Sequence, residues 1–234
     1  MVMVSKFLKQ SSNEQSAAKR KENFFAKSSG QVAEAPVDRL VVCVTGMPGA
    51  GKSVFAEVSK DLGFEIFRMG DDVRMEAERR RIPPSDENLG AIMMQLRQSG
   101  GPVAIAVLCK RRIEKEASSE LVLIDGIRNI NEFHEFKKLG KAVLVSIHTS
   151  PQSRFEFLKA RARSDSPSIF ASFEARDRRE LAVGIGEAIA LADQVIINSG
   201  TLDELKDKAY EVLKSLKEAY AKEKKRRVEQ PVSA

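Results

Sequence analysis

Two residue types that build metal sites and disulfide frameworks are scarce in this sequence. Its 234 residues include two cysteines and two histidines, and they contain no C-x-x-C motif. This excludes a disulfide scaffold, and we do not expect a zinc site. Cys43 lies in an apolar run and Cys109 in a helical pattern, so we interpret both as small buried side chains of a protein in a reducing compartment.

Long apolar runs are missing as well. No run approaches the roughly 18 residues of a membrane-spanning helix, and the first residues form no apolar core of the signal-peptide kind. We therefore expect a soluble, cytoplasmic protein with no membrane partner. With 42% hydrophobic residues the chain can bury a full core, and its length suits one α/β domain with appendages.

The central part of the chain also lacks a strong charge imbalance. The net charge is +6, and residues 1–38 and 217–234 together hold +5 of it. Residues 1–38 show no sustained hydrophobic period, which predicts a disordered extension; a transit peptide is the alternative, and the glutamates of this segment oppose it. The basic tail at 217–234 is either a nucleic-acid patch or, as we favour, a solvated helix end, so nucleic acid is a partner only through the tails.

The most informative stretch follows the apolar run Leu40–Val44. Residues 46–53 read GMPGAGKS and fill every fixed position of G-x-x-x-x-G-K-[ST], the phosphate-binding loop or P-loop. The alternative, a glycine-rich turn without a ligand, explains neither Lys52 nor Ser53. Lys52 suits the β- and γ-phosphates of ATP, and the Ser53 hydroxyl suits Mg²⁺. The residues assigned to the donor nucleotide in this loop are Gly46, Met47, Pro48, Gly49, Ala50, Gly51, Lys52, Ser53 and Val54.

Further apolar runs alternate with helical patterns through the rest of the domain at 39–216. Strands are predicted at 40–44, 64–67, 121–124, 142–148 and 195–197. This alternation predicts a five-stranded parallel sheet with helices on both faces, the three-layer sandwich of the P-loop NTPases. Ligands of such a sheet bind at the carboxyl ends of its strands.

An acidic residue, Asp125, ends the predicted strand at 121–124. A carboxylate at this end of a strand beside the P-loop is suited to hold Mg²⁺ together with Ser53. The alternative is a carboxylate that caps the following helix.

Arginines accumulate after the fourth predicted strand, across a polar break at 164–168. They favour a site for a polyanionic phosphate over a merely solvated helix face. These arginines are Arg154, Arg161, Arg163, Arg176, Arg178 and Arg179.

Taken together, these motifs resemble the nucleoside-monophosphate kinase branch of the P-loop proteins. Gly70-Asp71-x-x-Arg74 resembles the G-D-x-x-R segment of adenylate kinases, whose arginine grips the acceptor phosphate. Asp125-Gly-Ile-Arg128 resembles their D-G-F-P-R, but it is one residue shorter and lacks the proline. The resemblance implies a helical acceptor-binding insert over about 70–118 and a short lid over about 161–176. Arg161, Arg163, Arg176 and Arg179 match the arginines in and around that lid.

The segment at 192–205 is similar to dephospho-coenzyme A kinases. This likeness implies that the 198–201 loop, with Ser199 and Gly200, meets the adenine of ATP. Over the whole length the sequence is most similar to an archaeal family of adenylate-kinase-related proteins, with which it shares V-T-G-M-P-G-x-G-K-S, M-G-D-x-V-R, I-D-G-x-R and G-I-G-E-x-I-A-L-A-D.

The resemblance implies an ATP- and Mg²⁺-dependent phosphotransferase acting on a small nucleotide. A phosphate acceptor, most simply a nucleoside monophosphate, is predicted because arginines are plentiful; a hydroxyl acceptor such as dephospho-coenzyme A, with Asp71 or Asp72 as base, is the alternative. A nucleotide-driven switch or ATPase acting on RNA or a ribosomal partner is the rival from another class. The predicted catalytic residues are Lys52, Asp71, Asp125, Arg128, Arg161 and Arg163, the acceptor-binding residues are Asp71, Arg74, Arg128, Arg176 and Arg179, and the metal ligands are Ser53 and Asp125.

Overall fold

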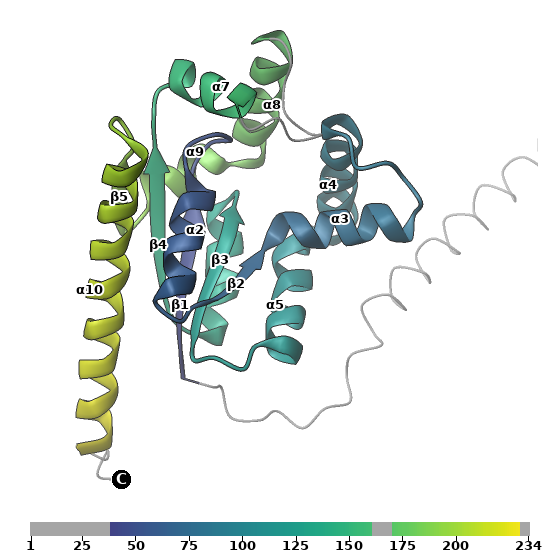
Figure 1. The fold of residues 1–234 in the computed structure, drawn as a ribbon. Coiled ribbons are helices and arrows are strands. Elements are labelled where there is room, and N and C mark those ends of the chain that lie inside the picture. The colour runs from purple at the N-terminus through teal and green to yellow at the C-terminus, as the bar shows by residue number, and fades with distance from the viewer. Residues whose placement is uncertain (1–37, 161–169, 230–234) are drawn as a thin grey trace, which may run out of the picture. The chain divides into compact units, whose positions relative to one another are not determined.

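A five-stranded parallel sheet forms the centre of the protein (Figure 1). The computed structural model describes residues 38–160 and 170–229. The strand order is β2-β3-β1-β4-β5, so β1 occupies the middle and the chain extends the sheet on both sides of it. The strands are β1 (Arg39–Thr45), β2 (Glu65–Arg68), β3 (Leu121–Ile127), β4 (Gly140–His148) and β5 (Gln194–Ile197).

Helices connect the strands and cover both faces of the sheet, as the alternating pattern predicted. Ser85 caps the start of α4, where its Oγ accepts the amide of Asn88 at 3.2 Å. The helices are α2 (Lys52–Asp61), α3 (Met69–Arg79), α4 (Asp86–Gly100), α5 (Ala104–Glu116), α6 (Ile130–Phe136), the 3₁₀ turn η1 (Lys137–Leu139), α7 (Pro151–Ala160), α8 (Phe170–Val183), α9 (Ile185–Ala190) and α10 (Leu202–Glu229).

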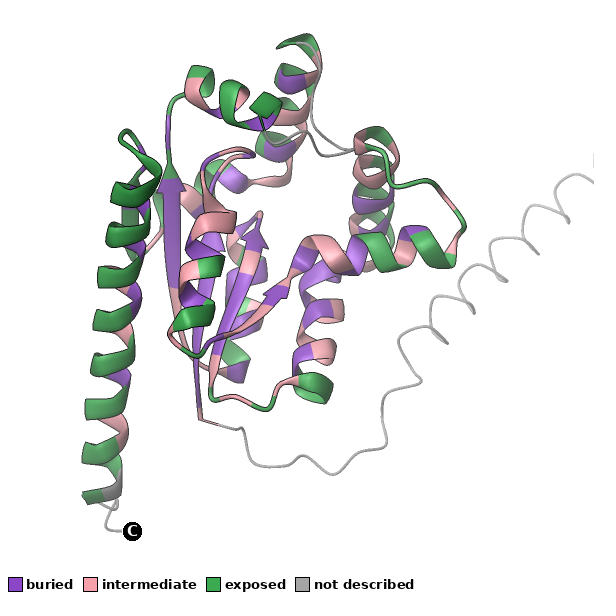
Figure 2. Cartoon of the chain, in the orientation of Figure 1, coloured by how far each residue is buried: buried purple, intermediate pink, exposed green. Residues whose placement is uncertain are grey.

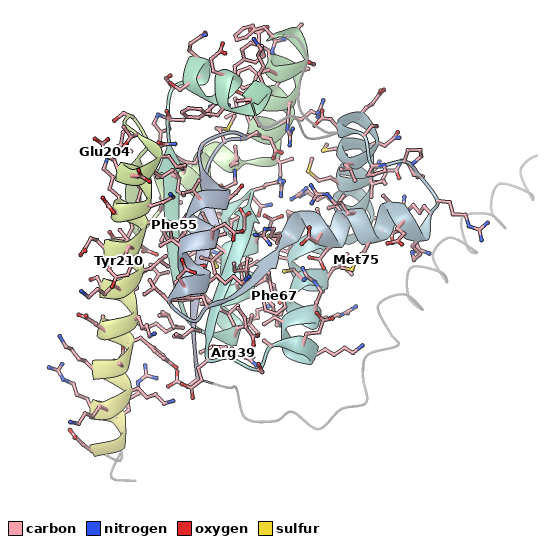
Figure 3. All side chains as sticks on the ribbon, in the orientation of Figure 1. Arg39, Phe55, Phe67, Met75, Glu204 and Tyr210 are labelled. Carbon is pink, nitrogen blue, oxygen red and sulfur yellow. The ribbon has the colours of Figure 1, made fainter. Side chains whose placement is uncertain are left out.

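Two apolar clusters lie on the opposite faces of the sheet. Successive side chains of β1 alternate between the two clusters. The whole strand is buried, as its colour in Figure 2 shows. Phe55 of α2 belongs to the cluster under α2 and α10, and Phe67 of β2 belongs to the cluster under α3, α4, α5 and α6 (Figure 3). The three layers fix β1 firmly and hold its carboxyl end in place.

Strand β3 is longer than the sequence pattern predicted. It does not stop at Ile124, because Asp125 pairs with Val44 and Ile127 pairs with Thr45. A register shift between these pairs is accommodated at Gly126, whose φ is +105°. The Thr45 hydroxyl also donates to Ile127 O at 2.9 Å, so Asp125 lies inside the strand, one step from the P-loop.

Helix α10 continues well past the boundary predicted at 216/217. Tyr220 is buried against the sheet cluster and donates its hydroxyl to Asp38 O, and Lys224 pairs with Glu120 at 2.6 Å. Part of the basic tail is therefore helical and docked on the domain. Three segments lie outside the described residues. They are residues 1–37 of the extension predicted at 1–38, residues 161–169 of the predicted lid, with Arg161 and Arg163, and the last five residues, 230–234.

Within residues 38–160 and 170–229, no helix has both the length and the apolar character that a bilayer span requires.

Candidate nucleotide-binding site

The P-loop joins the end of β1 to the first turn of α2, as the motif predicted. Gly46 has a φ of +137°, and a Cβ there would lie 2.3 Å from the carbonyl oxygen of Ile147 on β4. Gly51 caps α2 in the left-handed conformation, and its Cβ would lie 2.8 Å from Leu205. Only glycine fits either position, so the loop packs closely between β4 and α10. The N-terminus of α2 then points its free amides at the space above the loop.

Lys52 lies at the base of this loop with its ammonium group inside it. Its Nζ donates to Gly46 O at 2.6 Å and to Met47 O at 3.2 Å. Burial lowers the pKa of Lys52 to about 8, and the nearby charge of Asp125 partly opposes this shift. Among the described residues, Lys52 Nζ bonds two carbonyl oxygens and no carboxylate, so its positive charge favours an incoming anion.

Asp125 presents an unsatisfied acceptor to the same site. Its Oδ1 is buried and accepts no hydrogen bond from any described residue. Ser53, in the first turn of α2, lines the cavity beside it. Carboxylate and hydroxyl oxygens are hard ligands, and Mg²⁺ is typically held by one or two of them together with substrate phosphates and water. The described residues include no group of three or more His, Cys, Asp or Glu side chains arranged for a metal.

Arg128 lies at the end of β3 in a buried ion pair with Glu180 of α8. Its Nε donates to Glu180 Oε2 at 2.8 Å, and its Nη1 donates to Gly126 O at 2.9 Å. The charge of Glu180 raises the pKa of Arg128. Burial alone would raise the pKa of Glu180, but the charges of Arg128, Lys52 and Arg176 lower it below its usual value. Both side chains are therefore ionised at neutral pH.

These groups line one cavity of about 550 Å³ at the carboxyl edge of the sheet. Its polar wall combines the P-loop with Asp125 and with the Arg128–Glu180 ion pair, and its apolar wall comes from α7 and α10. Besides the P-loop residues, the lining includes Arg68, Gly70, Arg74, Asp125, Arg128, Phe157, Leu158, Arg176, Glu180, Ile185, Asn198, Gly200, Leu202 and Leu205.

On the acceptor side, the two aspartates proposed as alternative bases differ in their surroundings. Asp72 is buried and held by both ends of the Arg112 guanidinium, at 3.0 and 2.9 Å, so it is not available as a base; that alternative is wrong for Asp72. Asp71 pairs with Arg74 at 3.0 Å and is absent from the cavity lining. Arg74 itself lines the cavity, and a Cβ at Gly70 would lie 3.3 Å from its Nη1.

The arginines grouped by the sequence separate into different environments. Arg154 is buried outside the cavity: it pairs with both oxygens of Asp177 at 2.8 and 2.6 Å, donates to Pro48 O at 3.2 Å and lies over the Phe173 ring. The interpretation of Arg154 as a phosphate ligand is therefore wrong, because its guanidinium binds Asp177 and the P-loop carbonyl of Pro48 outside the cavity. Arg176 lines the cavity, whereas Arg179 does not.

The predicted base-binding loop at 198–201 reaches the cavity through Asn198 and Gly200. Asn198 is buried and donates its side-chain amide to Ala50 O of the P-loop at 3.0 Å. Gly200 lines the cavity, and Ser199 is absent from its lining. A capping box starts α10: the side chains of Thr201 and Glu204 each accept the other residue's backbone amide.

Sequence reasoning missed Glu180 and did not assign Asn198. Glu180 follows Arg176 by four residues, a spacing typical of paired charges on a helix, but its partner Arg128 is 52 positions away. Asn198 directly follows β5 at the carboxyl edge of the sheet, where a polar residue is a candidate ligand-binding residue.

Known proteins are similar to this sequence over most of its length. A UPF0200 protein of Hyperthermus butylicus is 40% identical over 178 residues, which cover 76% of this chain and 95% of that protein. The chain belongs to the UPF0200 family. A UPF0200 protein of Methanocaldococcus jannaschii is also 40% identical, over 187 residues that cover 80% of this chain and 95% of that one. The archaeal family indicated by the sequence motifs is thereby confirmed.

The fold of this UPF0200 member is confirmed by two further comparisons. A family model described as "AAA domain" matches residues 45–169. A crystal structure of TT1252 from Thermus thermophilus superposes with a TM-score of 0.56 at 17% identity, covering 76% of this chain and 98% of that one. The domain therefore has the predicted three-layer α/β fold of the P-loop NTPases, and the fold alone does not determine what it acts on.

Proposed function

We propose that this protein is an ATP-dependent phosphotransferase that moves the γ-phosphoryl group to a small phosphorylated acceptor, most simply a nucleoside monophosphate. The observation that carries the proposal is the single cavity into which the P-loop, the unsatisfied Asp125 oxygen and two arginines of the acceptor side converge. Phosphoryl transfer requires little covalent chemistry from the protein, so positioned charges of this kind account for most of its catalysis.

The donor phosphates fit the P-loop half of the cavity. The loop amides and the N-terminus of α2 donate to the phosphate oxygens, and Lys52 exchanges its two carbonyl partners for them. Ser53 and Asp125 would hold Mg²⁺, which neutralises donor charge when bound. Asn198 keeps the P-loop packed against the β5 edge through its bond to Ala50 O.

An acceptor phosphate fits the opposite half, where Arg74 and Arg128 line the cavity. A hydroxyl acceptor would need a carboxylate base there. Asp71 and Asp72 do not line the cavity, and each is paired with an arginine. Glu180 is ionised against Arg128 with a lowered pKa, which makes it a weak base. These surroundings support a phosphate acceptor over a hydroxyl.

The test is a transfer assay with ATP against nucleoside monophosphates and dephospho-coenzyme A. In the wild type we expect γ-phosphate on a nucleoside monophosphate with little release of free phosphate. Lys52→Ala should lower turnover by about 100-fold or more, because it removes a charge acting on the transferring group. Lys60→Ala, an exposed lysine of the same helix, is the matched control.

Near-normal turnover of folded Lys52→Ala would contradict the assignment. Transfer to dephospho-coenzyme A alone would identify a hydroxyl acceptor. Slow hydrolysis stimulated by RNA, without transfer to either small molecule, would instead identify a nucleotide-driven switch.

A further inference from the structure

A cross-connection joins helix α8 to helix α4. Asp86, the first residue of α4, pairs with Arg176 Nε at 3.4 Å through Oδ1 and with Arg179 through Oδ2. One carboxylate thus binds two guanidinium groups of α8 that are three residues apart. Helix α4 lies in the predicted acceptor-binding insert, and α8 begins within the predicted lid range and extends past it, so the contact connects α4 to the helix that carries Arg176.

The surface of α4 is shaped for this contact. Gly90 lies one turn after Asp86 on the same helix face, and a Cβ there would lie 3.2 Å from Arg179 Nε. Glycine within a helix costs about 1 kcal/mol relative to alanine. At this position it allows the guanidinium to lie flat against the helix and reach Asp86. The pairing is therefore supported by shape as well as by charge.

Two further ion pairs of α8 tie the same helix to the catalytic centre. Glu180 pairs with Arg128 at the end of β3, and Asp177 pairs with Arg154, which also donates to the P-loop carbonyl of Pro48. Helix α8 is therefore fastened to the phosphate site at two points and to α4 at a third. Among the residues of this third contact, Arg176 is the one that lines the cavity.

We propose that Asp86 is a positioning residue, which holds Arg176 at the cavity wall and keeps α4 closed against α8. Without this carboxylate, the long arginine side chain gains rotamer freedom, and α4 loses its link to the helix that carries Glu180. The acceptor would then meet a looser wall while the P-loop stays intact. The kinetic part of this inference rests on the proposed phosphotransferase activity, and the structural part does not.

The kinetic test compares Asp86→Asn with Glu87→Gln. Both residues lie in the first turn of α4 and share its dipole, but Glu87 is exposed and carries no ion pair among those described. Asp86→Asn should lower kcat/KM for the acceptor by about three- to tenfold, as expected for a partly exposed pair, and leave the ATP Kd within about twofold. Asp86→Glu should restore most of the loss. Equal behaviour of the Asn and Gln variants would overturn the proposal.

A distance measurement tests the connection without reference to catalysis. Cysteines introduced at Gln98 of α4 and Ala175 of α8 are exposed, whereas native Cys43 and Cys109 are buried and escape labelling. With nitroxide labels at both positions, double electron–electron resonance should give a narrow distance distribution. Adding Asp86→Asn should broaden this distribution or increase its mean distance, and adding Glu87→Gln should not. An unchanged distribution in folded Asp86→Asn would overturn the inference even if the protein proves to be a kinase.

Discussion

Lys52 supplies a positive charge to the proposed donor site. Its ammonium group donates to two carbonyl oxygens of its own loop, and burial lowers its pKa to about 8. A triphosphate beside it would favour the charged form and raise this pKa again. The protonation state of Lys52 is therefore linked to nucleotide binding.

We predict that ATP binding takes up a proton at pH 8.5. Most Lys52 side chains are neutral there in the free protein, because the pH lies above their pKa, and binding must charge them. Affinity should accordingly be greatest below pH 8 and fall as the pH rises through 8. Calorimetric titrations in buffers of different ionisation enthalpy measure the uptake, and pH 7 provides the comparison with little uptake. Proton uptake that is no larger at pH 8.5 than at pH 7 would contradict the lowered pKa.

Arg74 carries the second prediction at this scale. It lines the cavity from α3 with no role in the P-loop, so Arg74→Ala should lower kcat/KM for a phosphate acceptor by about 10- to 100-fold and leave ATP affinity unchanged. Arg79→Ala, an exposed arginine of the same helix paired with Glu76, should leave both constants near wild type. Steady-state kinetics with each substrate varied separates the two effects. A mild Arg74 variant beside an inactive Asp71→Asn would favour a hydroxyl acceptor.

The sequence predicted the P-loop residue by residue because each position of that motif is fixed by local geometry. The partners of the charged side chains escaped prediction because they come from distant parts of the chain. Asp72 is held by Arg112, 40 positions away, and Arg154 is held by Asp177 on another helix. A carboxylate or a guanidinium is equally plausible as a ligand or as half of an ion pair until the fold places its neighbours.

Elements were predictable where an apolar run is bounded by clear turn residues. The strands β1 and β4 and the capped starts of α4 and α10 follow this rule. The end of β3 was missed because Asp125 and Gly126 resemble a turn, although pairing with β1 continues through them. The end of α10 was predicted as a solvated helix, and its packing on the domain was missed because its last turns are mostly charged and only Tyr220 is buried.

The docked end of α10 yields a stability prediction. Tyr220 is 5% exposed and donates to Asp38 O, whereas Tyr210 on the same helix is 42% exposed. Tyr220→Ala should lower the free energy of unfolding by about 2–4 kcal/mol through lost burial and an unpaired carbonyl. Tyr210→Ala should change it by less than about 1 kcal/mol. Urea unfolding followed by circular dichroism measures both. If Tyr220→Ala lowered the free energy of unfolding as little as is expected for Tyr210→Ala, this end of α10 would not stabilise the domain.

At the scale of the whole molecule, the fold gathers its functional groups at one edge of the sheet. The P-loop follows β1, Asp125 and Arg128 belong to β3 and its end, and Asn198 follows β5. Helix α8 adds Arg176 and Glu180 and is tied by ion pairs to the P-loop side, to β3 and to α4. A ligand in this cavity therefore contacts elements from nearly the full domain, and its binding should stabilise the domain as a unit.

This linkage leads to a prediction about Mg²⁺ and Asp125. Free ATP and ATP with Mg²⁺ should both raise the unfolding temperature of the wild type, and at about 100 times its Kd the Mg²⁺ complex should contribute about 2.7 kcal/mol. In Asp125→Asn the neutral amide no longer offers the buried carboxylate oxygen to a cation, so the increment caused by Mg²⁺ should disappear while the effect of ATP alone remains. Asp61→Asn, an exposed aspartate at the end of α2, should keep the full increment. Thermal unfolding with ATP, in the presence of Mg²⁺ or EDTA, measures both terms for each variant. If Asp125→Asn retained the Mg²⁺ increment, the metal would be held by the phosphates and Ser53 alone, and the unsatisfied Asp125 oxygen would need another partner.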